Sequence, residues 1–192
     1  MSSREQKRQK VMGKGSSGRR NKWLVPALFG LVILAIAGVG LGRKQAPAAP
    51  QVQSARTESV SYDADGRIEQ IPVSASQAGG VITVPLAEVK EKKLVGFTYQ
   101  GQGKSLPLLA YIAPSGKVVT AVSMCEPCNS TTFHTEGTQL VCNTCGTRWN
   151  LEDLSGVSGG CLSYPPDPFG NTLVDGKIQI QEASVSGWQR RV

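Results

Sequence analysis

Two Cys-x-x-Cys pairs constrain this chain more than any other feature of its sequence. Cys125 and Cys128 form the first pair, and Cys142 and Cys145 form the second, with thirteen residues between the pairs. Each pair can form a short loop, or knuckle, that aims two thiolates at one point, so the spacing predicts a four-sulfur metal or iron–sulfur site. Thiolates are soft ligands that favour zinc, iron, iron–sulfur clusters and Cu(I), so the residues narrow the metal without naming it.

The residues that follow the two pairs also favour metal binding. The residue after the second cysteine of a knuckle often takes a positive φ, which glycine adopts freely and asparagine tolerates. Gly146 follows the second pair and Asn129 follows the first. The competing interpretation is a pair of disulfides, but a bridge within Cys-x-x-Cys closes too small a loop to stabilise a fold and is more often redox-active.

Several further residues are candidates for this site. Cys161, in the Ser-Gly-Gly-Cys segment 158–161, is a possible additional ligand, a thiol in the site wall or a small buried residue. His134, the one histidine, is either a ligand or an exposed polar residue. Aromatic and apolar neighbours, Leu151 among them, would shield the centre from water. The residues expected in the site wall are Phe133, Gly146, Trp149 and Tyr164.

The N-terminal part of the chain has the pattern of a membrane anchor. Residues 1–22 carry eight basic side chains, and residues 23–42 form an uncharged stretch long enough to cross a hydrocarbon core of about 30 Å as a helix. Only Arg43 and Lys44 follow this stretch closely, so the positive-inside rule predicts a cytoplasmic tail, one transmembrane helix and an extracytoplasmic C-terminal domain. The expected location is a bacterial-type cytoplasmic membrane.

Two alternatives for this region stay open at the sequence level. The segment Ala46-Pro47-Ala48 loosely resembles a signal-peptide cleavage site, although the apolar run is longer than a signal core. Arg19 and Arg20 are either a twin-arginine signal for export of a folded protein or simply positive-inside charges.

The remaining sequence excludes several classes of function. Beyond the anchor region the chain carries eleven basic and thirteen acidic side chains, so the high isoelectric point belongs to the tail and not to a nucleic-acid-binding patch. No hydrolase constellation and no phosphate-binding loop are present. We therefore expect an electron carrier or metal-binding subunit more than a stand-alone enzyme.

Apolar periodicity predicts a linker at residues 43–78, with residues 56–78 either prolonging it or adding a hairpin, and a mostly β domain at residues 79–192. Residues 85–91 are the one convincing short helix, and tight turns are expected at residues 101–104, 114–116 and 175–176. The expected strands are 81–85, 94–99, 106–112, 117–123, 131–135, 139–141, 147–150 and 177–181.

The order of motifs over roughly residues 80–182 resembles the Rieske iron–sulfur domain. The matching features are the strand entry at residues 82–86, the turn at Gly116, the first knuckle, the segment VCNTCGTRWNL at residues 141–151, the Gly159-Gly160 turn and the closing strand from Asp175. The resemblance implies a small antiparallel β domain. Rieske proteins use Cys-x-His and Cys-x-x-His pairs, whereas this chain has cysteines throughout, which would lower the potential of a cluster and equally permits a single ion, as in rubredoxin-like sites.

The C-terminal domain is more similar still to predicted iron–sulfur membrane proteins of bacterial iron-uptake operons. Those proteins show Cys-x-x-Cys, then Cys-x-x-Cys-Gly, then Gly-Gly-Cys followed by prolines, which Pro165 and Pro166 match here. The resemblance implies an exported redox or iron-handling role with a membrane redox or transport complex as partner. A [2Fe-2S] cluster is the expected cofactor, with a single zinc or iron ion as the alternative. A zinc-stabilised accessory module and a thiol–disulfide oxidoreductase are the alternative functions.

Overall fold

Short strands joined by tight turns make up most of residues 52–192, the part of the chain that the computed structural model describes. The expected tail, the transmembrane segment 23–42 and the start of the linker lie outside the described residues. Within residues 52–192, none of the helices has both the length and the apolar character that crossing a membrane requires. The described residues are mostly β with few helices, which confirms the predicted fold class at that level.

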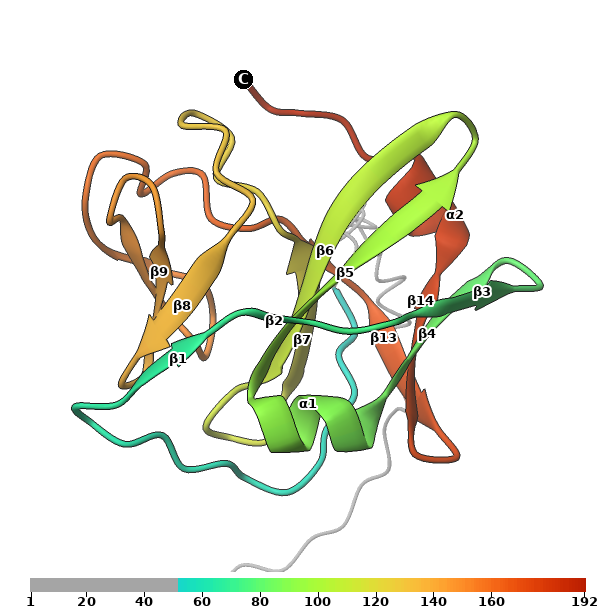
Figure 1. The fold of residues 1–192 in the computed structure, drawn as a ribbon, viewed down its shortest axis with the longest axis horizontal. Helices are drawn as coiled ribbons and strands as arrows, with labels where there is room; N and C mark the ends of the chain where they lie inside the picture. The colour runs from blue at the N-terminus through green and yellow to red at the C-terminus, as the bar shows by residue number, and fades with distance from the viewer. Residues whose placement is uncertain (1–51) are drawn as a thin grey trace, which may run out of the picture. The chain divides into compact units, whose positions relative to one another are not determined.

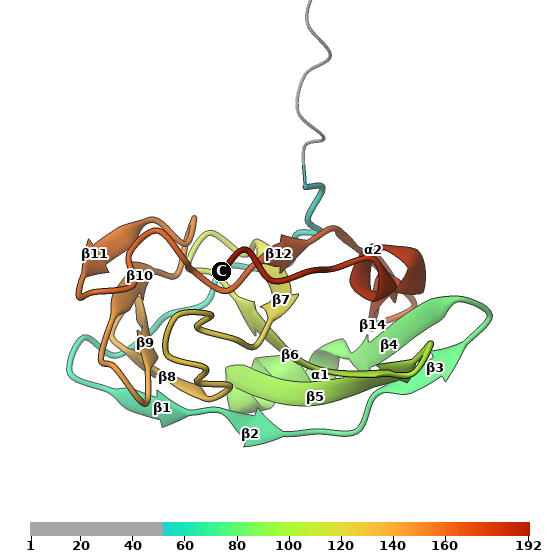
Figure 2. The ribbon, with the colours of Figure 1, turned by 90° about the horizontal axis from the view of Figure 1, so that it is seen from above.

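The two longest strands lie in the central sheet, which has the order β12-β7-β6-β5-β2 (Figures 1 and 2). Strands β5 (Leu94–Gly101), β6 (Lys104–Ile112) and β7 (Val118–Val122) are antiparallel neighbours. The edge strands are β12 (Pro168–Phe169), which pairs with β7, and β2 (Ile71–Pro72), which runs parallel to β5.

A second sheet, in the order β13-β14-β4-β3, carries both helices at its strand ends. It comprises β13 (Asn171–Val174), β14 (Lys177–Gln181), β4 (Val81–Pro85) and β3 (Ser76–Ala78). Helix α1 (Leu86–Lys92) follows β4 directly, and α2 (Glu182–Ser186) follows β14. The buried side chains of β4 and β14 join those of the central sheet in a first core, which includes Ile82, Val84, Phe97, Leu108 and Ile178.

The third sheet, in the order β1-β8-β9-β10-β11, contains the cysteine-bearing loops. Its strands are β1 (Arg67–Glu69), β8 (Phe133–Glu136), β9 (Gln139–Cys142), β10 (Arg148–Asn150) and β11 (Gly156–Ser158). Its apolar side chains form a second core with the opposite face of the central sheet. Figure 2 shows this sheet at one end of the domain and the β4–β14 sheet at the other.

Strand β6 contributes to both cores, because successive side chains of a strand point to opposite faces. Leu108, Ala110 and Ile112 belong to the first core, whereas Leu109 and Tyr111 belong to the second. The hydroxyl of Tyr111 donates a hydrogen bond of 2.9 Å to the carbonyl of Leu151, which links the central sheet to the cysteine-bearing region.

The three turns that the sequence predicts are present. Gln102 and Gly103 both have positive φ between β5 and β6, as do Asp175 and Gly176 between β13 and β14, which is the backbone that two-residue hairpins favour. Gly116 (φ 85°) turns the chain between β6 and β7, where a Cβ atom would lie 2.2 Å from the carbonyl oxygen of Thr57.

The segment before residue 79 pairs with the domain instead of continuing as a linker. Strand β1 pairs with β8, β2 with β5, and β3 with β4. Further back, the amide of Thr57 donates to the carbonyl of Gly116. Part of the linker expected over residues 43–78 thus belongs to the sheets, because β1, β2 and β3 cover the edges that β8, β5 and β4 would otherwise expose.

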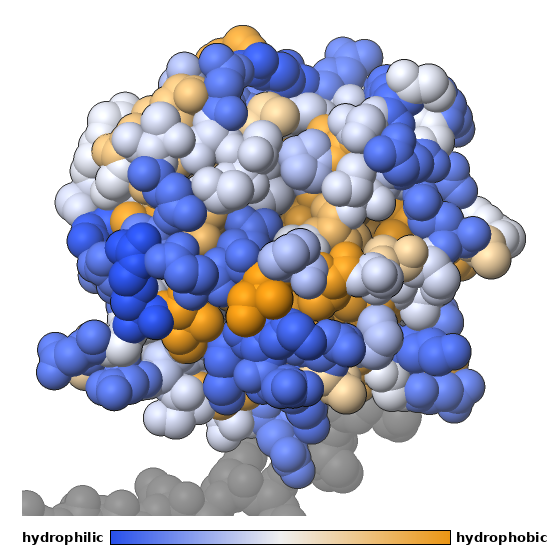
Figure 3. Space-filling view, viewed as in Figure 1, coloured by the Kyte–Doolittle hydropathy of each residue, from blue (hydrophilic) through white to orange (hydrophobic). Residues whose placement is uncertain are grey.

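Apolar atoms gather in the middle of the face seen in Figure 3, over the region where β2 crosses β5 in Figure 1. Ile71 of β2 is 38% exposed and is among the exposed large hydrophobic residues. Beside it, a shallow hollow runs along residues that include Pro72, Val73, Phe97 and Leu108. Nothing in the described residues covers this hollow.

Candidate metal centre

All five cysteines are free thiols, and they gather in one place where three loops meet. The sulfur of Cys145 lies 3.8 Å from that of Cys125 and 3.9 Å from that of Cys161. The sulfurs of Cys128 and Cys142 are 3.6 Å apart. The structure thus brings together the two pairs that the sequence singled out, and it adds Cys161 to them.

Four of the five sulfurs form one compact group. The sulfurs of Cys125, Cys128, Cys145 and Cys161 all lie within 4.8 Å of one another, and Cys142 is not a member of this group. A tetrahedral ion with metal–sulfur bonds of about 2.3 Å has sulfur–sulfur edges of about 3.8 Å. The donor atoms therefore fit a single four-coordinate ion by both their number and their spacing.

The first knuckle follows β7 and is closed by its own backbone. The amide of Cys125 donates a hydrogen bond of 2.8 Å to the carbonyl of Ser130, and these two residues form an isolated β-bridge. Asn129 has a φ of 59°, the left-handed conformation predicted for the residue after the pair. This turn carries Cys128 back toward Cys125, whose carbonyl lies 3.7 Å from the Cys128 sulfur.

The second knuckle connects β9 to β10. The amide of Cys142 donates to the carbonyl of Thr147, and the amide of Gly146 donates to the carbonyl of Cys142, both at 3.0 Å. Gly146 has a φ of 69°, as its place after the pair predicts. The loop projects outward, and residues 143–146 are exposed.

Thr147 brings the third cysteine-bearing segment to the site. Its Oγ1 accepts a 3.2 Å hydrogen bond from the amide of Cys161 and lies 3.3 Å from the sulfur of Cys145. Gly159 (φ 115°) packs so closely here that a Cβ atom would lie 2.6 Å from the Cα of Thr147. A glycine at position 159 is therefore what lets Cys161 approach the second knuckle.

The five thiols differ in burial and in proton affinity. Cys125, Cys142 and Cys161 are buried, Cys128 is half-buried and Cys145 is exposed. Burial raises the pKa of the Cys125 thiol and that of Cys128. Partial burial acts in the same direction on Cys145, but hydrogen bonds from the side chain and backbone of Thr147 and from neighbouring thiols outweigh it and lower the pKa of Cys145 to about 6.

The cysteine-bearing part of the chain matches a known protein family. Residues 89–192, which include all five cysteines, match a family described as membrane iron-sulfur containing protein FtrD-like. The chain belongs to this FtrD-like family. No curated protein and no solved structure matches the chain. The predicted similarity to proteins of iron-uptake operons is thereby confirmed at the level of an FtrD-like membrane iron–sulfur family, while the Rieske resemblance has no such support.

The FtrD-like match begins inside α1, so it does not include strands β1 to β4. Strands β1, β2 and β4 nevertheless pair with β8, β5 and β14 of the matched region, and β3 pairs with β4. The folded unit around the FtrD-like cysteines is therefore longer than the family match.

Two of the predicted wall residues pack directly behind the FtrD-like cysteines. Phe133 and Trp149 are fully buried, with ring centroids 6.3 Å apart at an interplanar angle of 61°, and they share the second core with Cys125 and Cys142. The indole N–H of Trp149 donates a hydrogen bond of 3.2 Å to the carbonyl of Leu162. These rings exclude water from the inner side of the cysteine cluster.

Tyr164, the remaining predicted wall residue, has a different position. Its amide donates 3.0 Å to the carbonyl of Cys161, so it continues the loop that carries this cysteine. Its half-buried ring contacts the C-terminal segment of the chain, where the guanidinium of Arg191 lies 5.8 Å from the ring centroid. Tyr164 thus belongs to the support of the Cys161 loop.

His134 is buried, with 4% of its surface exposed, so the prediction of an exposed residue is wrong. Strand β1 covers it, with Glu69 directly opposite in the register. Its Nδ1 lies beside Asn143 Oδ1, and its Nε2 lies 2.7 Å from Arg67 and 3.1 Å from Glu136. Both ring nitrogens therefore have protein partners, and the cluster of potential metal ligands does not include this histidine.

Sequence reasoning missed a contact between the first knuckle and the C-terminal residues Trp188–Arg191, here called the C-terminal strap. Glu126, inside the first Cys-x-x-Cys pair, is 1% exposed and forms an ion pair with Arg191. Arg190 donates a hydrogen bond of 2.6 Å to the carbonyl of Glu126. Figure 2 shows this segment crossing from α2 toward the cysteine-bearing end. In the sequence, the acidic Glu126 between two cysteines is the one sign that this knuckle has a basic partner.

The strap also holds the loop that follows Cys161. Arg191 donates a hydrogen bond of 2.7 Å to the carbonyl of Pro165. The indole N–H of Trp188 donates a hydrogen bond of 2.9 Å to a carboxylate oxygen of Asp167. The strap therefore connects the two loops that present Cys125 and Cys128 on one side and Cys161 on the other.

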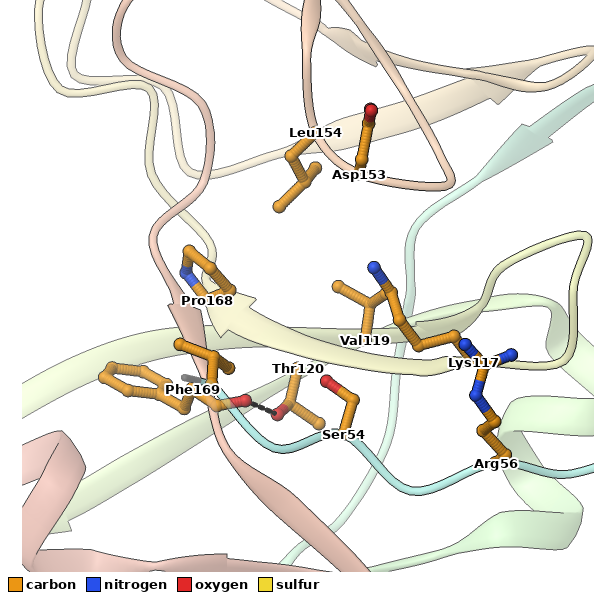
Figure 4. A pocket seen from close by; sticks show the side chains of 10 residues that line it. Ser54, Arg56, Lys117, Val119, Thr120, Asp153, Leu154, Pro168 and Phe169 are labelled. Atoms are coloured by element: carbon orange, nitrogen blue, oxygen red, sulfur yellow. Dashed lines mark hydrogen bonds between the residues drawn. The ribbon is translucent and has the colours of Figure 1, made fainter. Parts of the chain in front are cut away.

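A cavity of about 250 Å³ lies elsewhere in the FtrD-like domain, and none of the residues that line it is a cysteine. Figure 4 shows Arg56 and Lys117 at one end and Pro168 and Phe169 at the other. The hydroxyl of Thr120 donates a hydrogen bond of 3.1 Å to the carbonyl of Phe169. The cavity lining carries the charged side chains of Arg56, Lys117 and Asp153, and the group of potential metal ligands in the described residues lies at the cysteines instead, so the cysteines are the candidate site.

Proposed function

We propose that this chain is an extracytoplasmic electron carrier with a thiolate-bound iron centre, anchored in the membrane by residues 23–42. The observation that carries the proposal is the convergence of five free thiols from three loops onto one point. A bound iron ion or cluster supplies one-electron redox chemistry at such a site. The description of the family as membrane iron–sulfur proteins supports iron as the metal.

The protein environment suits electron exchange better than catalysis on a bound substrate. Phe133 and Trp149 close the inner side of the cluster, while Cys145 is exposed on the outer side. The loops around Cys145, residues 143–146 and 155–160, are exposed and carry no charged side chain. A partner of the membrane redox or transport type can therefore approach this edge without removing water from fixed charges.

The spacing of the sulfurs supports a single ion more than the [2Fe-2S] cluster expected from the resemblance. A two-iron cluster places its irons side by side with a thiolate pair on each, so sulfurs bound to different irons lie farther apart than those on one iron. Here four sulfurs lie within 4.8 Å of one another. We therefore favour one iron ion bound by four thiolates.

Analysis of the purified chain tests this proposal. The full-length protein, extracted from membranes in detergent, is assayed for iron, zinc and acid-labile sulfide, and its absorption spectrum is recorded with and without dithionite. About one iron per chain, no labile sulfide and a visible band that bleaches on reduction are expected. Colourless protein with one zinc per chain would rule the electron carrier out.

Zinc binding to a non-redox accessory module is the second candidate, because tetrahedral spacing suits zinc equally well. A thiol–disulfide oxidoreductase is the third, and the exposed Cys145 with its lowered pKa is the observation in its favour. The metal assay separates the first two. Turnover of a disulfide substrate by the metal-free chain would be needed to establish the third.

A further inference from the structure

The site offers five thiols, whereas a tetrahedral ion takes four. We propose that Cys125, Cys128, Cys145 and Cys161 bind the ion, and that Cys142 stays outside the coordination shell and donates its S–H to the sulfur of Cys128. This assignment rests on the proposed metal-binding function and deepens it. It differs from the arrangement that the two Cys-x-x-Cys pairs would give, in which Cys142 is a ligand and Cys161 is not.

The case for Cys161 rests on position and on support. Its sulfur lies within 4.8 Å of those of Cys125, Cys128 and Cys145, and it is 3.9 Å from the sulfur of Cys145. Its amide is fixed by Thr147 Oγ1, the same hydroxyl that lies beside Cys145. One side chain thus sets the separation of two thiols, which is the kind of second-layer support that orients metal ligands.

The pattern of exposure along the loop also indicates that Cys161 is a ligand. The flanking residues 155–160 and 162–163 are exposed, yet Cys161 itself is 9% exposed and points into the second core. Gly159 lets the loop approach Thr147 at a distance that no other residue permits. Pairing of β11 with β10 and the hydrogen bond from the Trp149 indole to the Leu162 carbonyl hold this loop against the second core. These contacts present the Cys161 thiol to the other cysteines.

Cys142 has different surroundings. It is the last residue of β9 and lies directly opposite Phe133, with both its amide and its carbonyl bonded to the second knuckle. Cys142 is 1% exposed, and its sulfur lies 3.6 Å from that of Cys128 and is not a member of the group of four. A neutral thiol in this place can donate to the Cys128 thiolate, and hydrogen bonds to ligand sulfurs shift the reduction potential of an iron centre.

Cadmium-113 identifies the ligands in the unaltered chain. The full-length protein in detergent, with carbon-13 at the β position of its cysteines, is loaded with cadmium-113, and couplings between the metal and the cysteine β protons are recorded by NMR. Couplings to Cys125, Cys128, Cys145 and Cys161, and none to Cys142, are expected. A coupling to Cys142, or the absence of one to Cys161, would overturn the assignment. Failure of the chain to take up cadmium would instead defeat the metal-binding function on which the assignment rests.

Matched variants test the two roles separately. Cys161→Ala is expected to lose most of its iron, whereas Cys142→Ala keeps about one iron per chain and has a more negative reduction potential than the parent. Cys142→Ser restores a donor, so its potential should return toward that of the parent. Retention of iron by Cys161→Ala, or its loss from a Cys142→Ser variant whose far-ultraviolet circular dichroism is unchanged, would contradict the proposal.

Discussion

At the scale of single residues, the cysteine cluster depends on a close contact between Gly159 and Thr147. We expect Gly159→Ala to destabilise the domain by about 3 kcal/mol, because the new Cβ would lie 2.6 Å from the Cα of Thr147 in a backbone with φ of 115°. The neighbouring Gly160→Ala is the control, since no atom lies within 4 Å of its Cβ position. Thermal unfolding of both variants, with metal content measured in parallel, checks the prediction. Equal stability of the two would refute it.

The titration of Cys145 gives a second prediction at this scale. In the metal-free chain its pKa is lowered to about 6, so the thiolate stabilises the folded state fully above the unfolded pKa of about 8.5, and this contribution is lost as the pH falls through about 6. Alkylation of Cys145 by iodoacetamide, followed by mass spectrometry, should reach half its maximal rate near pH 6. Thr147→Val should move this midpoint to higher pH, whereas Thr147→Ser should leave it nearly unchanged.

Some of these residues could be predicted from sequence, and others could not. The conformations of Asn129 and Gly146 follow from local backbone preferences next to each Cys-x-x-Cys pair, so their positive φ values were predictable. The burial of His134 could not be predicted, because it depends on pairing with β1, more than sixty residues earlier in the chain. The place of Cys161 depends on how closely Gly159 packs on Thr147, which no local pattern encodes.

At the scale of elements, the C-terminal strap joins two of the cysteine-bearing loops through the buried carboxylate of Glu126. We expect Arg191→Ala to cost about 2 kcal/mol, below the full value for a buried ion pair, because the arginine side chain is 34% exposed. Denaturant unfolding of the metal-free chain measures the loss.

Arg190→Ala is the matched control for the strap, because Arg190 donates only to the carbonyl of Glu126. Its cost should be about 1 kcal/mol or less. Adding Glu126→Gln to Arg191→Ala should recover part of the lost stability, since the unpaired charge is then removed. Identical losses for the two arginine variants would show that the Arg191 contacts with Glu126, Pro165 and Tyr164 together contribute no more than one hydrogen bond to a backbone carbonyl.

The strands that sequence predicted and those that it missed differ in length and burial. Strands β4 and β14 follow closely from apolar alternation, and β6 follows from a continuous apolar run, because both of its faces enter a core. Strands β1, β2, β3 and β11 have two or three residues, with mostly exposed side chains and no alternation to read. Their existence depends on neighbours that are distant in sequence.

At the scale of the whole molecule, the region matched by the family is expected to be too short to fold alone. A chain that begins at residue 89 lacks β4, which lies between β14 and β3, so Ile178 and Ile180 would lose their covering strand. A chain that begins at residue 52 keeps every strand of the three sheets. Far-ultraviolet circular dichroism and thermal unfolding should show a cooperative transition for the longer chain only. A cooperative transition in the shorter one would contradict this view.

Strand β6 lies between the two cores, because its successive side chains enter the first and the second core in turn. We expect removal of metal to weaken only the core on the cysteine side, since no cysteine belongs to the other. Backbone amides of β8, β9 and β10 should then exchange with deuterium by local opening, while those of β6 stay protected until β4 and β14 separate. Loss of the metal would in that way loosen one end of the domain and leave the other able to guide its reassembly.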